Sequence, residues 1–511
     1  MRGRRRVWSN GGGLVLVSSA TMRAARLLAG HDTSHALRAA AGRALASAGA
    51  TPVGTGTGVT QECASGVLCT TPAQCASATQ AGTPYVYARP VTNAVDMPAA
   101  ADAVALFTAS GGTTSHAAVL ARSWEKPTVV GTAFTLNRGT LTMPGGGTLR
   151  SGEWVTVCAT TGTVWRGRLE RYEDPRARDL VRELSEAAEV LGDLPGPVVY
   201  ANADTLAEAE RCMTLGAAGV GVARSEHMFF DVQELPHLRA ALWADQADGR
   251  EAALAKLRTG LVNKCRALMS GCSGKKLAIR LLDPPAHEFA APEDLPRLRE
   301  HNPMMGVRGS RLGVLRPDLY RTQAQAIVEA HLGLPPAQRS RLAILLPFLT
   351  TGAETRAVRR TLALPARAAA EVTVGAMIET PEAVFRAADI AAEVDYLSVG
   401  TNDLVQFSLG MSRDDVAAAL LPAYLSGKLL DDDPMAHLDH SLGTMGLIQI
   451  LSQTVPDTPW GVCGEHAADP PSLAALLPCG PAFVSVSAAG VLPARIEVGR
   501  YRARTLLEHD E

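Results

Sequence analysis

The chain has 511 residues, of which 47% are hydrophobic and 20% are charged. This length and composition are typical of a soluble globular protein with about two to four domains. The formal net charge of −2 argues against binding to nucleic acid or to an anionic membrane surface. An aromatic content of 5% argues against a platform on which nucleic-acid bases stack. Neither nucleic acid nor a membrane is therefore expected as a partner.

Cysteine usage and the amino terminus indicate the compartment. The nine cysteines are scattered and include no CxxC pair, so neither structural zinc nor a disulfide framework is predicted. We expect mostly buried thiols in a reduced cytoplasm. The basic start is followed by only four apolar residues, too few for a signal sequence, and no run of ~18 apolar residues predicts a membrane span. Roughly the first 20 residues are expected to form a disordered leader.

Changes in composition along the chain predict four parts. Residues 22–48 have helical composition and spacing. Short Val-, Thr- and Gly-rich runs then predict strands of a compact α/β domain, and a charge-rich helix over 167–194 follows them. The expected parts are a leader with a helical segment at 1–50, a β-rich α/β domain at 51–166, a linker helix at 167–195 and a second domain at 196–511.

The second domain carries a repeating pattern. From residue 197 onward, eight apolar runs alternate with amphipathic segments. Eight βα units over ~300 residues predict a (β/α)8 barrel, whose parallel strands are buried on both faces. The fold class is therefore α/β. The runs are VVYAN, GVGVAR, LAIRLLD, AILLPFL, VTVGAMIE, YLSVGTND, WGVCGEH and AFVSVSA.

Most of these runs end in polar or ionisable residues. The carboxyl ends of barrel strands converge on one mouth, so these side chains predict a single site there. Helix capping would explain any one of them, but it does not require paired arginines and carboxylates. They are Asn202, Asp204, Arg224, Glu226, Arg280, Asp283, Glu379, Asn402, Asp403, Cys463 and Glu465.

Residue types at this mouth suggest its chemistry. Glu379 and Asp403 end neighbouring strands, and oxygen ligands of this kind suit Mg²⁺. Arg280 and Arg308 form a second pair, because guanidinium groups bind phosphate and carboxylate in bidentate fashion. Together they describe a site for a small molecule that carries both groups. Cys463 is a candidate proton donor or acceptor, or alternatively a small buried core residue.

One histidine stands out in the first domain. In the stretch GGTTSHAAVLAR, two glycines and three hydroxyl residues precede His116, which begins a helix of small residues. On these residues alone, His116 is equally well explained as a surface group near a helix N-terminus.

Six motifs in the same order resemble those of phosphoenolpyruvate-utilising enzymes. The stretch GGTTSHAAVLARSWEKPTVVG resembles their phosphohistidine motif, and YLSVGTNDLVQFSLGMSRDD resembles their barrel signature. Four further stretches look most like the pyruvate, phosphate dikinases, and the similarity covers roughly residues 53–505. These four are IRLLDPPAHEF, NPMMGVRGSRLG, AMIETPEAVFRA and GVCGEHAADP.

The resemblance implies a role for each site residue. His116 would carry the phosphoryl group, which the N-terminus of its helix would help to stabilise. Cys463 would protonate the enolate of pyruvate. The resemblance further implies that Arg280 and Arg308 hold the phosphoryl group and substrate, that Glu379 and Asp403 ligate Mg²⁺, and that Gly400, Thr401 and Asn402 line the pyruvate pocket.

The resemblance also sets expectations for partners. A full dikinase carries an ATP-grasp domain before the phosphohistidine domain, whereas only about 50 residues precede it here and no Gly-rich phosphate loop occurs among them. A separate ATP-grasp chain is therefore expected, and a homodimer through the barrel is implied. Alternatives are a phosphoenolpyruvate-dependent protein phosphotransferase, a catalytically silent module that senses phosphoenolpyruvate or pyruvate, and a fragment of a longer enzyme.

Overall fold

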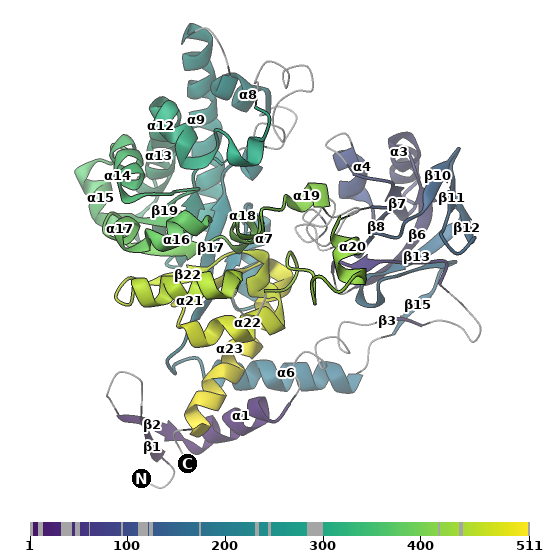
Figure 1. Ribbon diagram of the computed structural model, residues 1–511, viewed down its shortest axis with the longest axis horizontal. Coiled ribbons are helices and arrows are strands. Elements are labelled where there is room, and N and C mark those ends of the chain that lie inside the picture. The colour runs from purple at the N-terminus through teal and green to yellow at the C-terminus, as the bar shows by residue number, and fades with distance from the viewer. Residues whose placement is uncertain are drawn as a thin grey trace. The chain divides into compact units, whose positions relative to one another are not determined.

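The computed structural model forms two compact units (Figure 1). The first comprises Met1–Pro195, Met411–His437 and Arg495–Glu511, and the second comprises Gly196–Gly410 and Leu438–Ala494. The structure describes residues 4–8, 14–31, 43–45, 52–60, 62–92, 96–110, 121, 126–172, 175–229, 235–243, 247–283, 300–416, 420–438 and 443–508.

The first unit contains the β-rich domain that the sequence predicts. Its largest sheet has eight strands in the order β4-β14-β13-β6-β7-β8-β9-β5, and β10, β11 and β12 form a second sheet. The strands are β4 (Gly54–Thr55), β5 (Thr57–Gly58), β6 (Cys63–Cys69), β7 (Tyr85–Arg89), β8 (Ala105–Thr108), β9 (Thr128–Val130), β10 (Thr135–Asn137), β11 (Thr140–Thr142), β12 (Thr148–Arg150), β13 (Trp154–Cys158) and β14 (Thr163–Arg166). A 3-10 turn, Ala159–Thr161, joins β13 to β14.

Two apolar clusters cover the two faces of this large sheet. On one face, Phe107 and Val155 pack against Leu141 and Leu149 of the small sheet. On the other face, buried side chains of β7 contact the helices α3 (Pro72–Gln80) and α4 (Met97–Asp102). The domain therefore has its own core, with apolar side chains on both faces of its central strands.

One disulfide lies within this domain. Cys63 and Cys158 are paired positions of the antiparallel strands β6 and β13, and their sulfurs are bonded. The cysteine spacing predicts no disulfide framework, and this bond differs from that expectation because strand register brings together two cysteines that lie 95 residues apart. The seven other cysteines are free, and six of them are buried, as expected for core thiols.

The segments that flank the β-rich domain differ from the sequence expectation. Strands β1 (Arg4–Trp8) and β2 (Leu14–Ser18) pair in antiparallel fashion where a disordered leader was expected. The helix expected over 22–48 is α1 (Ser19–Ala29), which ends at Gly30, and β3 (Arg43–Leu45) is a strand. Gly30 caps α1 through a hydrogen bond to the Arg26 carbonyl.

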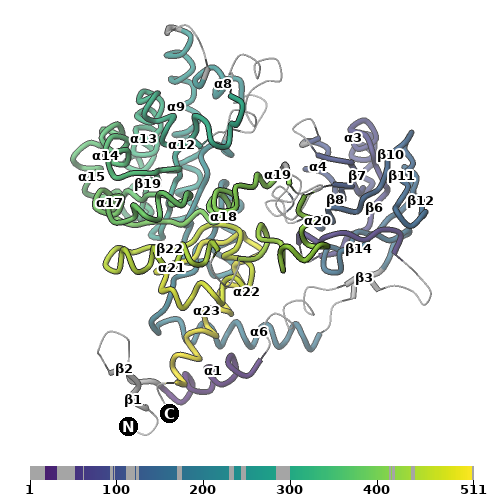
Figure 2. The backbone as a smooth tube through the Cα atoms, in the orientation of Figure 1, coloured from purple at the N-terminus to yellow at the C-terminus, as the bar shows by residue number. Residues whose placement is uncertain are grey.

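The linker helix also begins later than expected. Strand β15 (Glu170–Tyr172) pairs with β3, and α6 (Pro175–Val190) follows it. Proline is favoured at a first helical position and disfavoured inside a helix, so Pro175 accounts for the later start. Helices α1 and α6 lie side by side (Figure 2). Two short helices, α19 (Arg413–Val416) and α20 (Leu420–Ser426), also belong to this unit.

The second unit is the predicted barrel. All eight predicted runs form strands, and these close into a parallel barrel in chain order. Both faces of each strand are covered, which explains the nearly continuous apolar runs. The strands are β16 (Val198–Asn202), β17 (Gly219–Arg224), β18 (Lys276–Arg280), β19 (Arg341–Leu346), β20 (Thr373–Ile378), β21 (Tyr396–Val399), β22 (Trp460–Val462) and β23 (Phe483–Val486).

Helices surround this barrel (Figure 1). They are α7 (Leu206–Thr214), α8 (Leu235–Trp243), α9 (Ala247–Ser270), α12 (Gly309–Leu315), α13 (Pro317–Leu332), α14 (Gly352–Thr361), α15 (Ala366–Glu371), α16 (Pro381–Phe385), α17 (Ala387–Ala391), α18 (Thr401–Leu409), α21 (Thr444–Thr454) and α22 (Pro470–Leu476). Short 3-10 turns occur at His227–Phe229, Pro303–Met305, Pro336–Gln338, Glu465–Ala468 and Leu477–Cys479. Helix α23 (Ala488–Glu508) begins in this unit and ends in the first one.

The barrel lumen is filled by side chains that set the positions of the site residues. An interior cluster includes Val222, Ala278 and Met377, with Tyr200 packed against it. Side chains alternate along a strand, so residues two positions further on point into the lumen nearer its carboxyl end. Those residues are Asn202, Arg224, Arg280 and Glu379.

No helix among the described residues is both long enough and apolar enough to span a bilayer.

Candidate functional site

Three carboxylates meet at the carboxyl end of the barrel. Asp283 follows β18, Glu379 follows β20 and Asp403 lies in the first turn of α18, after β21. One oxygen from each side chain lies within 4.8 Å of one from each of the others, and all three residues are buried. The sequence pattern predicts Glu379 and Asp403 as metal ligands of this site, and it indicates Asp283 only as a polar residue at a strand end.

Two arginines are held against these carboxylates. Nε of Arg308 donates to Oδ1 of Asp283 at 2.8 Å, and its Nη2 donates to Oδ2 of Asp403 at 2.8 Å. Nη1 of Arg280 lies 3.5 Å from Oδ2 of Asp283, while its Nη2 donates to Oε1 of Glu226. Both arginines predicted from the sequence therefore lie at the cluster, and Glu226 is a partner that the sequence did not assign.

Burial and like charge dominate the electrostatics of Glu379. Burial, with Asp403 and Asp283 nearby, raises the pKa of the Glu379 carboxyl well above its usual range. Burial disfavours the charge of Arg308, but the attraction of Asp283 and Asp403 is larger and raises the pKa of its guanidinium. An added cation beside Glu379 would relieve the repulsion that raises its pKa.

The backbone after β19 also binds Glu379. The amide of Phe348 donates to Oε1 of Glu379 at 2.9 Å, and Phe348 has a φ of 54°. A non-glycine residue with this conformation is uncommon and is held by its surroundings. The guanidinium groups of Arg308 and Arg311 lie 4.6 and 4.7 Å from the centre of the Phe348 ring. Phe348 thus positions both a carboxylate and an arginine of the site.

The segment Gly400, Thr401 and Asn402 lies beside the carboxylates. A Cβ atom on Gly400 would stand 2.8 Å from Cγ of Glu379, so only glycine permits this approach. Thr401 begins α18, whose first backbone amides have no partner within the helix. Nδ1 of His466 and Oγ1 of Thr401 are 2.8 Å apart, and Oδ1 of Asn402 accepts from the Glu465 amide at 2.9 Å.

Cys463 follows β22 and faces the lumen. Its Sγ lies 3.6 Å from the carbonyl oxygen of Val399, and its own carbonyl accepts a hydrogen bond from Nδ2 of Asn202 at 3.2 Å. Burial raises the pKa of the Cys463 thiol to about 11, and the nearby Glu379 also raises it. Arg280 and Arg224 oppose this shift. The thiol is therefore protonated at neutral pH and sits within the field of the charged groups.

The structure brings together most of the residues that the sequence indicated. Arg280, Arg308, Glu379, Asp403, Gly400, Thr401, Asn402 and Cys463 all lie at the carboxyl end of the barrel. His116, which the sequence also indicated, lies outside the residues that the structure describes. The signal that could have found Asp283 and Glu226 is present in the sequence, since Asp283 ends one predicted strand and Glu226 lies two residues after another.

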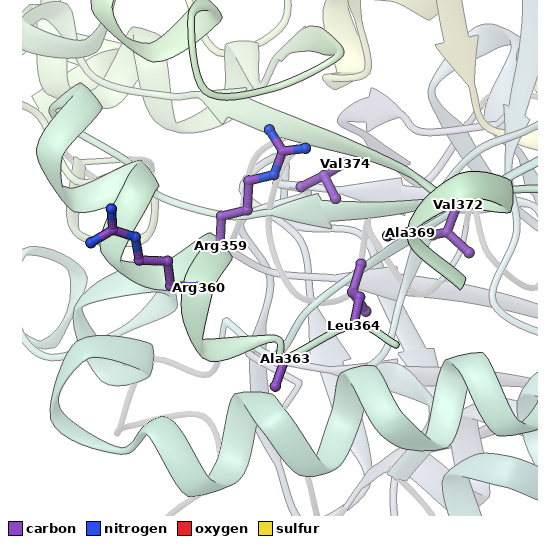
Figure 3. A pocket seen from close by; sticks show the side chains of 7 residues that line it. All are labelled: Arg359, Arg360, Ala363, Leu364, Ala369, Val372 and Val374. Carbon is purple, nitrogen blue, oxygen red and sulfur yellow. The ribbon is translucent and has the colours of Figure 1, made fainter. Parts of the chain in front are cut away.

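A separate pocket lies at the opposite end of the barrel strands (Figure 3). It encloses about 230 Å³ and is near the start of β20, where Val372 and Val374 contribute to its wall. The end of α14 places Arg359 and Arg360 at its rim. Because Glu379 follows the other end of β20, this pocket is distinct from the carboxylate cluster.

Comparison with protein families identifies the class of this chain. Residues 178–503 match the PEP-binding domain of PEP-utilising enzymes, and residues 83–162 match their mobile domain. The chain therefore belongs to the PEP-utilising enzymes, where PEP is phosphoenolpyruvate.

Similar curated proteins are named pyruvate, phosphate dikinase. That of Rickettsia typhi is 33% identical over 433 residues, which are 78% of this chain and 48% of the relative. Pyruvate, phosphate dikinase 2 of Oryza sativa subsp. japonica is 34% identical over 463 residues, 83% of this chain and 51% of the relative. That of Clostridium symbiosum is 30% identical over 462 residues, which are 84% of this chain and 52% of the relative. The chain spans about half the length of the curated relatives it matches.

Proposed function

We propose that this chain exchanges a phosphoryl group between phosphoenolpyruvate and His116, with pyruvate as the other product. In this proposal, residues 51–166 form a swivelling phosphohistidine domain, 1–50 a leader and helical segment, 167–195 its linker, and 196–511 the substrate-binding barrel. The observation that carries the proposal is the cluster of Asp283, Glu379 and Asp403 with two arginines at the barrel mouth.

Mg²⁺ fits the donor set of this cluster. Carboxylate oxygens are the hard ligands that Mg²⁺ prefers, and three of them converge here. Among the described residues of this end of the barrel, the carboxylates of Asp204, Glu226, Asp283 and Asp403 pair with the guanidinium groups of Arg224, Arg280 and Arg308, so these carboxylates and Glu379 outnumber the arginines. Glu379 and Asp403 would hold the ion, which when bound would neutralise charge on substrate oxygens. The binding of an anionic substrate would therefore depend on the metal.

The side chains of this chain then supply binding and proton transfer. Arg280 and Arg308 bind the phosphoryl group, and the first amides of α18 hold the carboxylate of the substrate. A ring nitrogen of His116 forms a bond to phosphorus while the bond from phosphorus to the enol oxygen breaks. The enolate takes the proton of the Cys463 thiol at its methylene carbon and becomes pyruvate. The thiolate regains a proton from solvent.

Two partners complete the proposal. A separate ATP-grasp chain would perform the nucleotide half-reaction, so labelled ATP alone should leave His116 unlabelled. A second copy of the chain would form a homodimer through the barrel, which light scattering measures. Exposed apolar side chains on the barrel unit support an interface, since Met305, Val314 and Leu315 are each more than half exposed.

Labelled phosphoenolpyruvate tests the function directly. The wild-type chain with Mg²⁺ should acquire acid-labile label, release pyruvate in equal amount and lose both when the metal is chelated. His116→Ala should remain unlabelled while still binding phosphoenolpyruvate. His35→Ala changes another histidine of the amino-terminal region and should label normally. Binding of phosphoenolpyruvate without any label on His116 would contradict the proposal and favour a sensing module.

A further inference from the structure

The side chain of Asn202 connects the first barrel strand to the backbone of Cys463. Asn202 ends β16, and its Nδ2 donates to the carbonyl oxygen of Cys463 at 3.2 Å. Its Oδ1 accepts a hydrogen bond from the hydroxyl group of Ser485 at 2.6 Å. A carbonyl oxygen can only accept, whereas a hydroxyl group can donate, so these two partners fix the orientation of the Asn202 amide. The two hydrogen bonds join residues that lie 261 and 283 positions apart in the chain.

A bulge in the neighbouring strand makes room for Ser485. This fully buried residue of β23 pairs in register with Tyr200, whose ring packs against the lumen cluster, so both side chains face the lumen. The register between β16 and β17 shifts at Asn202, and Gly221 is the extra residue of β17 at this point. A Cβ atom on Gly221 would stand 2.4 Å from Oγ of Ser485. Only glycine therefore leaves space for the hydroxyl group that holds Asn202.

Contacts from two directions hold the end of β22, where Cys463 lies. The amide of Cys463 donates to the carbonyl oxygen of Val399 at 3.0 Å, and a Cβ atom on Gly464 would stand 2.0 Å from Oγ1 of Thr401. These contacts come from β21 and the start of α18, on one side of β22. Strand β23 and then β16 follow on the other side of β22 in the closed barrel. Asn202 therefore reaches the Cys463 backbone from the opposite direction.

We infer that Asn202, held by Ser485, is a positioning residue for the Cys463 thiol. This inference rests on the proposed function, in which Cys463 exchanges a proton with the methyl carbon of pyruvate. Such a transfer requires the sulfur to lie close to that carbon, and a displacement on the order of 1 Å can slow a reaction by about 10²-fold. Asn202 contacts the backbone of Cys463, so its loss should lower the rate of proton transfer and leave the binding of pyruvate unchanged.

Rate and binding measured on the same variants separate this role from a general one. With Mg²⁺ and saturating pyruvate, Asn202→Ala should slow exchange of the methyl hydrogens with deuterated solvent by about 10- to 100-fold. The Kd of pyruvate, measured by calorimetry, should change by less than about twofold. Asn202→Asp keeps the acceptor for Ser485 but loses the donor to Cys463, so it should be slow as well, and Ser485→Ala should slow exchange by a smaller factor. Ser452→Ala is the matched control, because it removes a hydroxyl group that donates to the carbonyl of Cys479 at 2.6 Å, and it should exchange at the wild-type rate.

A double-mutant cycle tests whether Asn202 acts through the thiol. The double variant of Asn202→Ala and Cys463→Ser should exchange no more slowly than Cys463→Ser by itself. Additive slowing, or a rise in the Kd of pyruvate that matches the loss of rate, would overturn the inference. Exchange at the wild-type rate by Asn202→Ala would also overturn it, while leaving the proposed function intact. If Cys463→Ser exchanges normally, the proposed role of the thiol fails and this inference fails with it.

Discussion

The Cys463 thiol combines burial with a fixed place beside charged groups. Its pKa of about 11 keeps nearly all of it protonated at neutral pH, so it is suited to donate a proton to an enolate. Cys463→Ser should slow exchange of the methyl hydrogens of pyruvate with deuterated solvent by about 10²- to 10⁴-fold. Nuclear magnetic resonance measures this exchange.

A second thiol provides the control for this substitution. Cys479 lies half-buried in the turn Leu477–Cys479, away from the carboxylates, and Cys479→Ser should exchange at the wild-type rate. Phosphoenolpyruvate binding by Cys463→Ser should stay close to that of the wild type. Normal methyl exchange in Cys463→Ser would assign the proton transfer to another group.

The amine of Lys276 lies at the other end of the lumen. Its nitrogen is 4.1 Å from the centre of the Tyr396 ring, and burial together with Arg341 lowers the pKa of Lys276 to about 8. A lowered pKa of an amine means that the folded state binds its proton less tightly than the unfolded chain does. Stability from this group is therefore lost as the pH falls through about 8 and is fully present above the unfolded pKa of about 10.4.

This linkage predicts a pH dependence of stability. As the pH rises from about 8 to about 10.4, the wild-type barrel should gain on the order of 1–3 kcal/mol relative to Lys276→Met. Urea unfolding at several pH values measures the difference. Lys256→Met, at an exposed position of α9, should show no such trend. A difference between wild type and Lys276→Met that does not change with pH would contradict the prediction.

At the scale of elements, glycines differ in whether the surrounding packing leaves room for a side chain. A Cβ atom on Gly375 of β20 would stand 2.3 Å from the ring of Tyr396 on β21. Gly375→Ala should therefore lower the free energy of unfolding by roughly 1–3 kcal/mol, because the ring has to move within a packed core. Thermal unfolding measures this loss.

Gly446 offers the opposite case within the same barrel. It lies inside α21, and no atom would come within 4 Å of an added Cβ, so Gly446→Ala should stabilise the protein by up to ~1 kcal/mol. Equal changes in the free energy of unfolding for the two substitutions would contradict the prediction that the contact with Tyr396 makes Gly375→Ala destabilising.

The elements themselves were predictable where their patterns were local. Each barrel strand is an apolar run in the sequence because both of its faces are covered, and strands also form in the β-rich domain, where short Val-, Thr- and Gly-rich runs predict them. Residues 43–45 and 170–172 read as helical, yet they pair as β3 and β15. That pairing joins segments more than 120 residues apart, so no local sequence pattern predicts it.

The candidate site was only partly predictable for a related reason. Glu379 and Asp403 end neighbouring predicted strands, so barrel topology alone brings them together. Other parts of the site depend on loops, and no periodic sequence pattern predicts the path of a loop. They include the contact of Arg308 with Asp283 and the positive φ of Phe348. Asp283 was therefore visible as a strand-end residue but not as a member of the cluster.

At the scale of the whole molecule, the two units have separate cores. The β-rich domain packs around Phe107 and the barrel around Met377, so we expect two calorimetric transitions. Mg²⁺ with phosphoenolpyruvate at 100 times its Kd should stabilise the barrel by about 2.7 kcal/mol and leave the other transition in place. Glu379→Gln should abolish the shift. A single transition that moves as a whole would show that the units unfold together.

The fixed position of the Cys463 sulfur has a stereochemical consequence. Its Sγ is held 3.6 Å from the Val399 carbonyl at the end of a barrel strand, so it stands on one side of the lumen. An enolate bound in that lumen is planar and presents a single face to the sulfur. Phosphoenolpyruvate that carries deuterium and tritium at its methylene carbon in a defined E or Z arrangement should then yield a chiral methyl group of one handedness.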